Sequence, residues 1–249
     1  MSEPPDPVMV VPTRDWQDER LVTIVLPVLH DTAALGSVLP TLPHHPTVEI
    51  VVVDGGDPAE SAMAQLRAVN PDIIWIRSPA GRAVQMNRGA REGRGRWLLF
   101  LHADTRLGAN WLDALRAVDD RPDSVGGSFA FMLDTPARWA RWIERGVRLR
   151  VRLFDLPYGD QALFVRRAIF DDLGGYRDLP LMEDVDFVVR LRRRGRLDHL
   201  PVAATTSPRR WERDGWLRRS VDNAVLVTLF FAGAAPARLA RRYNREPRP

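Results

Sequence analysis

Four short apolar segments constrain the fold of this chain more than any other feature of its sequence. They are residues 21–27, 48–54, 72–76 and 96–101, and stretches of helix-forming composition separate them. Nearly continuous apolar runs of this length are typical of strands that are buried on both faces of a sheet. Strands that alternate with helices indicate βαβ units. We therefore predict an α/β domain with a Rossmann-like, mostly parallel central sheet flanked by helices.

The second half of the chain is richer in predicted helices. Residues 125–133 are consistent with a further strand, and we expect helices over 136–154 and 182–194 and from 215 onward. The last of these would form a C-terminal helical extension. Residues 1–20 are rich in proline and acidic side chains, which predicts a disordered leader and not a signal peptide.

The charge of the chain is modest, and its basic residues are all arginine. The 249 residues carry 36 basic and 32 acidic side chains, a formal net charge of +4, so the composition does not indicate a nucleic-acid partner. The guanidinium group grips phosphate bidentately, which suits a phosphorylated ligand. The absence of Cys excludes disulfides and thiolate metal sites. The longest apolar stretch, 224–236, is too short to span a membrane, and we expect a cytoplasmic protein.

The strand predicted at 96–101 ends in a His-Ala-Asp sequence. In open α/β sheets ligands bind beyond the carboxyl ends of the strands, so His102 and Asp104 are placed where a substrate would lie. Asp104 offers the hard oxygen ligand that Mg²⁺ and Mn²⁺ prefer, while the softer His102 would position a metal or a phosphate. The alternative is that Asp104 only caps a turn.

Two other strand ends carry polar residues that suit a nucleotide. Asp54 closes the strand 48–54 before two glycines, which suits a hydrogen bond to a ribose or a base, although an ordinary helix N-cap also explains it. Arg82 opens the helix that follows the strand 72–76, where backbone N–H groups favour phosphate. A solvated arginine is the alternative there.

Two clusters late in the chain complete the candidate site. Glu183 and Asp184 begin a predicted helix, and a carboxylate is the usual group that removes a proton from an alcohol, so Asp184 is the candidate base. Acidic residues in a first helical turn also complement the helix dipole without any catalytic role. Arg210 beside Trp211 would clamp a diphosphate and stack on a sugar, or else anchor a surface loop.

Taken together, these motifs resemble a known family. The segments VVVDGG, GRAVQMNRGA, FLHADT, YGDQALFVRR, LMEDVDFVVRLRRRG and SPRRW, in this order, are similar to those of inverting family 2 glycosyltransferases on the GT-A fold. They resemble in particular a bacterial subgroup labelled arsenosugar-biosynthesis glycosyltransferase. The resemblance implies a single GT-A-type domain over 21–244. Its parts would be a nucleotide-sugar-binding half (21–105), an acceptor-binding half (106–214) and C-terminal helices (215–244).

The resemblance also implies roles for individual residues. Asp184 would be the catalytic base, and Asp104 would hold a divalent cation, Mg²⁺ or Mn²⁺, with His102 in place of the first Asp of the DxD motif. Ser207 stands where the QxxRW motif of processive relatives has Gln, so polymerisation is not expected. The donor site would comprise Pro27, Asp54, Arg82, Asn87, His102, Ala103 and Asp104. The acceptor site would comprise Asp160, Gln161, Glu183, Arg210 and Trp211.

Together with these residues, the resemblance implies a metal-assisted, inverting transfer of a sugar from a nucleoside-diphosphate sugar to an unidentified acceptor hydroxyl. UDP is the nucleotide that the resemblance favours, and GDP and dTDP stay open. Two other functions are alternatives: a nucleotidyltransferase on the same fold, and a non-catalytic, membrane-associated binding protein. A nucleotidyltransferase is expected to carry a Gly-rich basic loop after its first strand, and PVLHDTAALG is not such a loop.

The basic helix predicted at 136–154 has two interpretations. Trp139 and Trp142 repeat with Ile143 and Val147 at helical spacing, which favours a buried stripe packed on the sheet. A basic helix with exposed tryptophans would instead lie on anionic lipid and give the protein a peripheral contact with the inner face of the membrane. We expect the buried arrangement.

Overall fold

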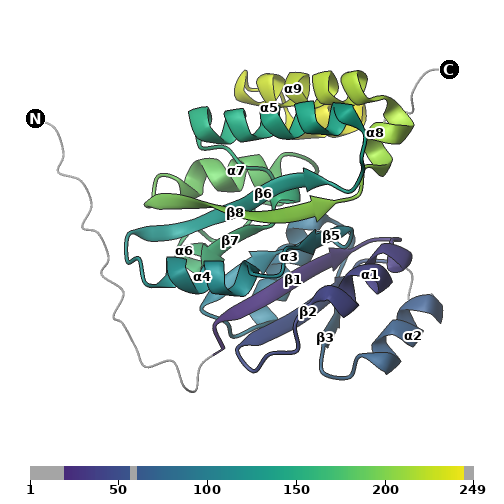
Figure 1. Cartoon of the computed structure of the whole chain (residues 1–249), viewed down its shortest axis with the longest axis vertical. Helices are drawn as coiled ribbons and strands as arrows, with labels where there is room; N and C mark the ends of the chain where they lie inside the picture. The colour runs from purple at the N-terminus through teal and green to yellow at the C-terminus, as the bar shows by residue number, and fades with distance from the viewer. Residues whose placement is uncertain (1–19, 57–60, 244–249) are drawn as a thin grey trace, which may run out of the picture.

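One sheet organises the protein. The computed structural model describes residues 20–56 and 61–243, and within this part of the chain eight strands join in the order β3-β2-β1-β4-β7-β6-β8-β5 (Figure 1). The strands are β1 (Val22–Val28), β2 (Val48–Asp54), β3 (Ile74–Arg77), β4 (Trp97–Phe100), β5 (Thr105–Leu107), β6 (Ser124–Leu133), β7 (Leu163–Arg166) and β8 (Arg196–Thr206). The pairs β1–β2, β2–β3, β1–β4 and β6–β8 are parallel, while β4–β7, β6–β7 and β5–β8 are antiparallel. The predicted α/β fold with a mostly parallel sheet is confirmed.

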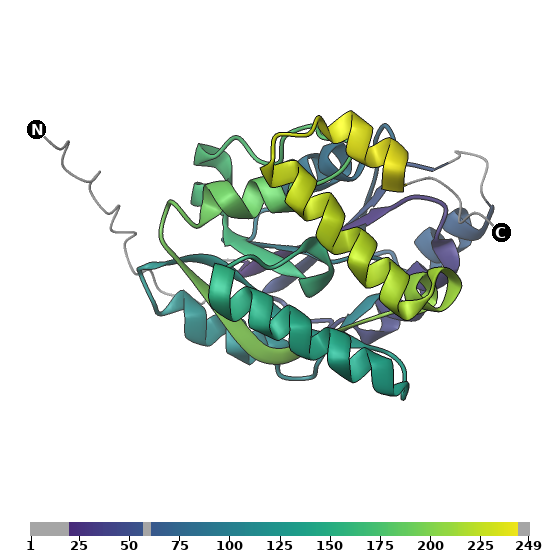
Figure 2. The same ribbon diagram turned by 90° about the horizontal axis from the view of Figure 1, so that it is seen from above.

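Helices cover both faces of this sheet (Figures 1 and 2). One core lies under α1 (Thr32–Val38), α2 (Ser61–Val69) and α4 (Trp111–Asp119), with the short 3₁₀ turn η1 (Leu39–Thr41) after α1. The core on the other face lies under α3 (Arg82–Glu92), α6 (Arg167–Asp172), α7 (Glu183–Leu191), α9 (Trp216–Phe231) and α10 (Pro236–Tyr243). A third, small core joins β6 to α5 (Arg138–Phe154) and α8 (Arg209–Asp214). Among the residues that the structure describes, no helix is long and apolar enough to cross a membrane.

Strand β1 shows why the apolar runs form this sheet. Ile24 and Leu26 point into one core and Val25 points into the other, and all three side chains are fully buried. A strand that is covered on both faces has no solvent side, so it needs apolar residues at successive positions. The four predicted strands correspond to β1, β2, β3 and β4, within two residues at each end.

The second half of the chain also follows the predictions in outline. The further strand is β6, the three expected helices are α5, α7 and α9, and α10 completes a C-terminal helical extension. Strand β8 was not predicted, and it is the longest strand of the described sheet. The predicted leader, residues 1–20, lies outside the described residues except for Arg20.

Helix α3 packs closely against the sheet, and this contact sets the position of the helix. A Cβ atom on Gly89 would lie 2.4 Å from Val25 Cγ1 and 2.8 Å from Val53 Cγ2, so only glycine lets the helix come this close to β1 and β2. Gln85, in the first turn of α3, donates to the carbonyls of Val28 and Val53 at 2.8 Å each, so the start of this helix, which opens with Arg82, lies at the carboxyl ends of β1 and β2.

The expected burial of the tryptophans on α5 is wrong. Trp139 and Trp142 are 60% and 65% exposed. The buried residues of this helix are Ala140, Glu144 and Val151, which share its opposite side. The helix therefore packs on the sheet through a narrow face and presents its large apolar side chains outward.

Candidate functional site

Three parts of the chain meet at one edge of the sheet, and strand pairing explains why. Strand β7 runs antiparallel to β4 with Phe100 opposite Leu163, so the residues before β7 lie beside the residues after β4. Strand β8 runs antiparallel to β5 with Thr105 opposite Thr206, which brings the residues after β8 to the same place. The predicted motifs on these three segments therefore form one rim.

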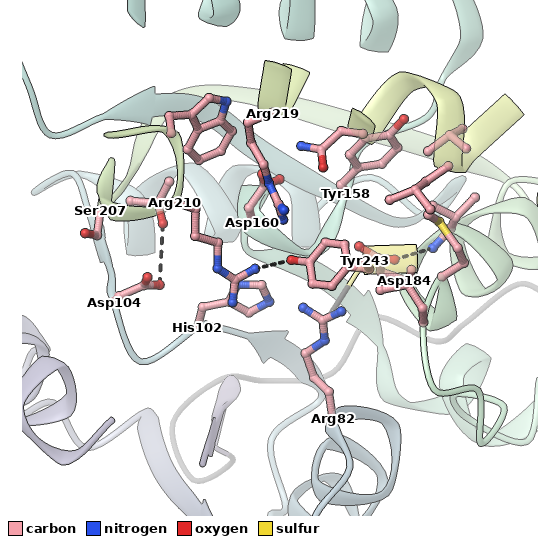
Figure 3. Close-up of a pocket in the computed structure, with 18 residues that line it drawn as sticks. Arg82, His102, Asp104, Tyr158, Asp160, Asp184, Ser207, Arg210, Arg219 and Tyr243 are labelled. Atoms are coloured by element: carbon pink, nitrogen blue, oxygen red, sulfur yellow. Dashed lines mark hydrogen bonds between the residues drawn. The ribbon is translucent and has the colours of Figure 1, made fainter. Parts of the chain in front are cut away.

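A cavity of about 130 Å³ lies at this rim (Figure 3). Its walls come from strand ends, from the first turns of α3 and α7, and from the C-terminal helices α9 and α10. The charged residues of its lining are Arg82, Asp104, Asp160, Asp184, Arg210 and Arg219. Guanidinium groups and carboxylates in one small space suit a ligand that carries both an anionic group and hydroxyls.

Two backbone hydrogen bonds fix the Asp184 carboxylate at the cavity. Its Oδ2 accepts a hydrogen bond from the backbone N–H of Gly159 at 2.8 Å, and its Oδ1 accepts one from the N–H of Val185 at 2.8 Å. These bonds fix the side chain in the first turn of α7, and the residue stays partly exposed to the cavity. A Cβ atom on Gly159 would lie 3.2 Å from both Asp184 Oδ2 and His102 Nε2, so the carboxylate and the imidazole flank the same glycine.

His102 follows β4 and is neutral at physiological pH. Burial, together with the positive charges of Arg82 and Arg210, lowers the pKa of His102 from 6.5 to about 3. The imidazole therefore keeps a free lone pair, which is available to a metal or to a hydrogen-bond donor.

Asp104 lies on the opposite side of His102 from Asp184 (Figure 3) and is only loosely engaged. Its Oδ1 is 3.5 Å from the Thr206 hydroxyl and its Oδ2 is 3.3 Å from Arg209, which binds Asp31 more closely at 2.6 Å. Both contacts are at the outer limit for hydrogen bonds, so the carboxylate oxygens are open to a cation. The described residues contain no cluster of three or more His, Cys, Asp or Glu side chains that would hold a metal unaided.

A chemical argument still fits a divalent cation to this position. Mg²⁺ is usually bound through one or two carboxylates and completes its shell with phosphate oxygens and water. Asp104 supplies one such carboxylate, and neutral His102 supplies a second donor on the same cavity wall. The pair matches a cation that is held jointly by the protein and a diphosphate.

Arg82 is paired with a buried carboxylate behind the cavity. Its Nε donates to Oε1 of Glu183, which is almost completely buried at the start of α7. Burial alone would lower the pKa of Arg82, but the negative charges of Glu183 and Asp184 outweigh it and raise the pKa. The guanidinium therefore remains charged, and the ion pair links α3 to α7 across the cavity floor.

Two buried polar atoms of the lining have no hydrogen-bond partner among the described residues. They are Asp160 Oδ1 and Trp211 Nε1. Burial raises the pKa of the Asp160 carboxyl from 3.8 to about 6, with Arg150 acting against the rise. Buried polar atoms are nearly always paired in native proteins, so both atoms are candidates for contact with a bound ligand.

Some predicted site residues lie outside the cavity lining. They are Pro27, Asp54, Asn87, Ala103, Gln161 and Glu183. Asp54 ends β2 at the same edge of the sheet, where its carboxylate accepts hydrogen bonds from the Gly56 N–H at 2.8 Å and from Arg77 at 3.0 Å. Pro27 lies beside it in β1, opposite Val53.

The two predicted amides hold the backbone in place. Asn87 donates to the carbonyl of Tyr176 at 2.8 Å and accepts from its N–H at 2.9 Å. Gln161 accepts from Arg150 at 2.9 Å and donates to the carbonyl of Phe129 at 3.3 Å. Ala103 is buried between the two residues of the HxD sequence. These side chains position the segments that carry the cavity.

The C-terminal helices contribute cavity residues that no motif indicated. Arg210 donates to the hydroxyl of Tyr243, the last residue of α10, and the Arg219 guanidinium lies 4.4 Å from the centre of the same ring. Figure 3 shows the Tyr243 hydroxyl pointing toward Arg210. Arg219 is buried and also donates to Asp214 at 3.4 Å.

Comparison with known proteins identifies the family. Residues 24–177 match the family model described as Glycosyl transferase family 2. The chain belongs to this family. Its relatives include the PGL/p-HBAD biosynthesis glycosyltransferases of Mycobacterium tuberculosis and Mycobacterium bovis, each 31% identical over 180 residues that cover 68% of this chain and 69% of the relative. This family 2 protein is therefore an enzyme, a glycosyltransferase, as the resemblance of its motifs implied.

Solved structures agree on the fold of this family 2 enzyme. S. aureus TarS superposes with a TM-score of 0.56 at 15% identity, covering 76% of this chain and 37% of TarS. TarS 1–349 in complex with UDP-GlcNAc gives a TM-score of 0.55 at 15% identity, covering 75% and 58%. The chain thus spans about a third to three-fifths of those structures. The predicted GT-A-type architecture is confirmed at the level of the fold.

Proposed function

We propose that this family 2 glycosyltransferase moves a sugar from a nucleoside-diphosphate sugar to an acceptor hydroxyl with inversion at the anomeric carbon. The observation that carries the proposal is that Asp104 and Asp184, far apart in the sequence, line one cavity with three arginines. Two of the structurally similar TarS structures are complexes with UDP and UDP-GlcNAc, which makes UDP the first nucleotide to test. Family membership favours sugar transfer over nucleotidyl transfer and over a non-catalytic role.

Asp184 is the proposed base. The acceptor hydroxyl gives its proton to the Asp184 carboxylate while its oxygen forms a bond to the anomeric carbon. The bond from that carbon to the phosphate oxygen breaks at the same time, and the nucleoside diphosphate leaves with the electron pair. A single displacement of this kind inverts the anomeric centre. The two backbone hydrogen bonds to Asp184 hold its oxygens in place, so little reorganisation precedes the proton transfer.

Asp104 and His102 are the proposed ligands of a divalent cation, Mg²⁺ or Mn²⁺. When bound, the cation would neutralise charge on the diphosphate and so stabilise the leaving group. The arginines of the cavity would supply further positive charge for the same purpose. Arg82 and Arg210 lie near enough to His102 for their charges to lower its pKa, so both are close to this proposed metal ligand. Asp54 is proposed to contact the nucleoside at the end of β2, beside Pro27.

The acceptor is proposed to bind at the side of the cavity formed by Asp160 and Trp211. Their unpartnered atoms offer a hydrogen-bond acceptor and a donor, which suits a hydroxylated ligand. The Trp211 ring is packed against Phe131 with 6.0 Å between ring centres, so its position is fixed. Gln161 and Glu183 do not line the cavity but hold residues close to it. Gln161 accepts a hydrogen bond from Arg150, and Glu183 pairs with Arg82.

A nucleotide-binding screen tests the donor and metal assignments. Thermal unfolding is followed with UDP, GDP or dTDP, each with Mg²⁺, Mn²⁺ or a chelator. A ligand at about 100 times its Kd stabilises the native state by about 2.7 kcal/mol, so a specific nucleotide raises Tm measurably. We expect the rise with UDP and metal to be lost in Asp104→Asn and kept in the exposed control Asp178→Asn. An equal rise in Asp104→Asn would remove this residue from the metal site.

A further inference from the structure

Most of the large apolar side chains that are exposed in the described chain lie on two adjacent helices. Of the eleven large hydrophobic side chains that are exposed in this part of the structure, eight belong to α5 or α9. Those on α5 are Trp139, Trp142, Leu149, Leu153 and Phe154, and those on α9 are Leu217, Val221 and Phe231. Both helices lie on the same side of the molecule, where Figure 2 views them from above. A concentrated apolar surface on two neighbouring helices indicates an interaction site.

The outward face of α5 combines this apolar stripe with unpaired positive charge. With about 100° between successive helical residues, Trp142, Leu149 and Leu153 fall within about 40° of one another. The adjoining 80° or so holds Arg141, which pairs with Glu144 at 3.0 Å, and four further arginines. These are Arg138, Arg145, Arg148 and Arg152. All four are exposed, and none forms an ion pair with any residue that the structure describes. Glu144, the acidic residue of this helix, is buried on the opposite side.

We infer that the outward face of α5 and α9 docks on the surface of an anionic lipid bilayer. Tryptophan and leucine side chains flanked by arginines match the chemistry of the interface, because the rings and aliphatic groups enter the acyl boundary while guanidinium groups contact lipid phosphates. The Arg145 guanidinium already lies 5.2 Å from the centre of the Trp142 ring, which places charge and aromatic surface together. A second copy of the chain fits this face less well, because a symmetric pair would bring arginines against arginines.

The same face lies close to the cavity. On α9, Arg219, Asn223 and Leu226 line the cavity, while Leu217 and Val221 point outward from the same helix. A helix with its side chains is about 10 Å across, so docking would hold the cavity roughly one helix diameter from the bilayer surface. This geometry suits an acceptor whose hydroxyl group is carried by a membrane lipid. Docking itself does not depend on the proposed sugar transfer.

Vesicle sedimentation of the full chain tests the inference. The probes are vesicles of phosphatidylcholine alone and of phosphatidylcholine with about 30% phosphatidylglycerol, at about 0.1 M and about 1 M salt, since this range shortens the Debye length from about 10 Å to about 3 Å. We expect binding to the anionic vesicles at low salt, and much weaker binding to the neutral vesicles and at high salt. Absence of binding to anionic vesicles at low salt overturns the inference.

Matched variants distinguish vesicle binding through this face from non-specific adsorption. Arg148→Gln with Arg152→Gln should weaken binding on the order of 20-fold, because each arginine near an anionic surface contributes about a fivefold factor. Trp142→Ser with Leu149→Ser should weaken it at least on the order of 10-fold. The controls are Val69→Ser, an exposed apolar residue on α2, and Arg88→Gln with Arg91→Gln on α3, which should bind as the parent does.

The remaining outcomes are equally decisive. Equal loss in the control variants, or a dimer in light scattering that Trp142→Ser with Leu149→Ser dissociates, would overturn the inference. UDP-induced thermal shifts, measured on the same proteins, should be unchanged by every variant of this face. If the protein binds UDP but not anionic vesicles, the docking inference is wrong and the proposed function is unaffected. If it binds anionic vesicles but not UDP, the docking inference holds and the proposed function is in question.

Discussion

Replacing Asp160 with asparagine should stabilise the fold at neutral pH and leave its stability nearly unchanged near pH 4. Burial raises the pKa of this carboxyl from 3.8 to about 6, so the native state prefers the protonated form. Stability from this preference is fully present below pH 3.8 and is lost as the pH rises through 6. The rise corresponds to about 3 kcal/mol at neutral pH, since one pKa unit is worth 1.36 kcal/mol. Asparagine has nearly the same shape and no charge, so it avoids this cost.

Urea unfolding at pH 4.5 and pH 7.5 measures the effect. We expect the free energy of unfolding of Asp160→Asn to exceed that of the parent at pH 7.5 by up to about 3 kcal/mol, and the gain to shrink several-fold at pH 4.5. Asp178→Asn removes an exposed carboxylate and should change neither value by more than about 0.5 kcal/mol. A gain of the same size at both pH values would refute the reasoning, because burial of a titrating group would not be its cause.

Three further predictions concern stability. His102→Gln should make the fold less sensitive to acid. In the parent, the imidazole takes up a proton at pH 5 only in the unfolded state, which lowers the free energy of unfolding by about 2 kcal/mol. A parallel loss of stability in both proteins between pH 6.5 and 5 would contradict this. Arg82→Gln should cost roughly 3 kcal/mol in chemical unfolding by leaving a buried carboxylate unpaired, and adding Glu183→Gln should restore part of it; no recovery would count against the ion pair. Gly89→Ala should cost about 1–3 kcal/mol, whereas Gly146→Ala, with open space around it, should be neutral or stabilising; equal effects would show that α3 does not need its close approach.

The sequence predicted the strands of the parallel half because each carries its own signal. In β1 and β2 every position is buried or nearly so, and a nearly continuous apolar run is visible without knowledge of any partner. Strand β8 lacks that signal, since it contains a proline and several exposed positions. It is a strand because β6 and β5 pair with it on either side. Those partners lie far away in the sequence, so a local pattern cannot reveal them.

The orientation of α5 shows a second limit. Apolar residues at helical spacing predicted one buried stripe, but this helix has apolar residues on two sides. Ala140 and Val151 face the protein, while Trp142 and Leu153 face outward. Spacing alone cannot say which side packs on the sheet. The size of the side chains decides it here, because the small residues allow the helix to approach β6.

The candidate site was predictable where its residues follow strands or begin helices. Asp104 and Asp184 belong to motifs of this kind. Antiparallel pairing of β7 with β4 brings Gly159 beside the segment of Asp104, and the Gly159 N–H donates to the Asp184 carboxylate. Tyr243 and Arg219 were not predictable, because they enter the cavity from helices that pack over it late in the chain. Asp54, predicted together with the other carboxylates, lies at the same edge of the sheet but outside the cavity.

Sugar transfer by Asp184→Asn tests the central claim most directly. Transfer is measured as the release of UDP, and NMR determines the anomeric configuration of the product. Calorimetry measures the affinity for UDP in the presence of Mn²⁺. Asp186→Asn is the matched control, because it removes a carboxylate from the same helical turn. The Asp186 carboxylate accepts hydrogen bonds from Arg177 and Arg190 and does not line the cavity. We expect Asp184→Asn to lower transfer at least on the order of 10²-fold with UDP affinity within a few-fold of the parent, and Asp186→Asn to retain transfer. Full activity in Asp184→Asn, or a product with retained configuration, would contradict the account.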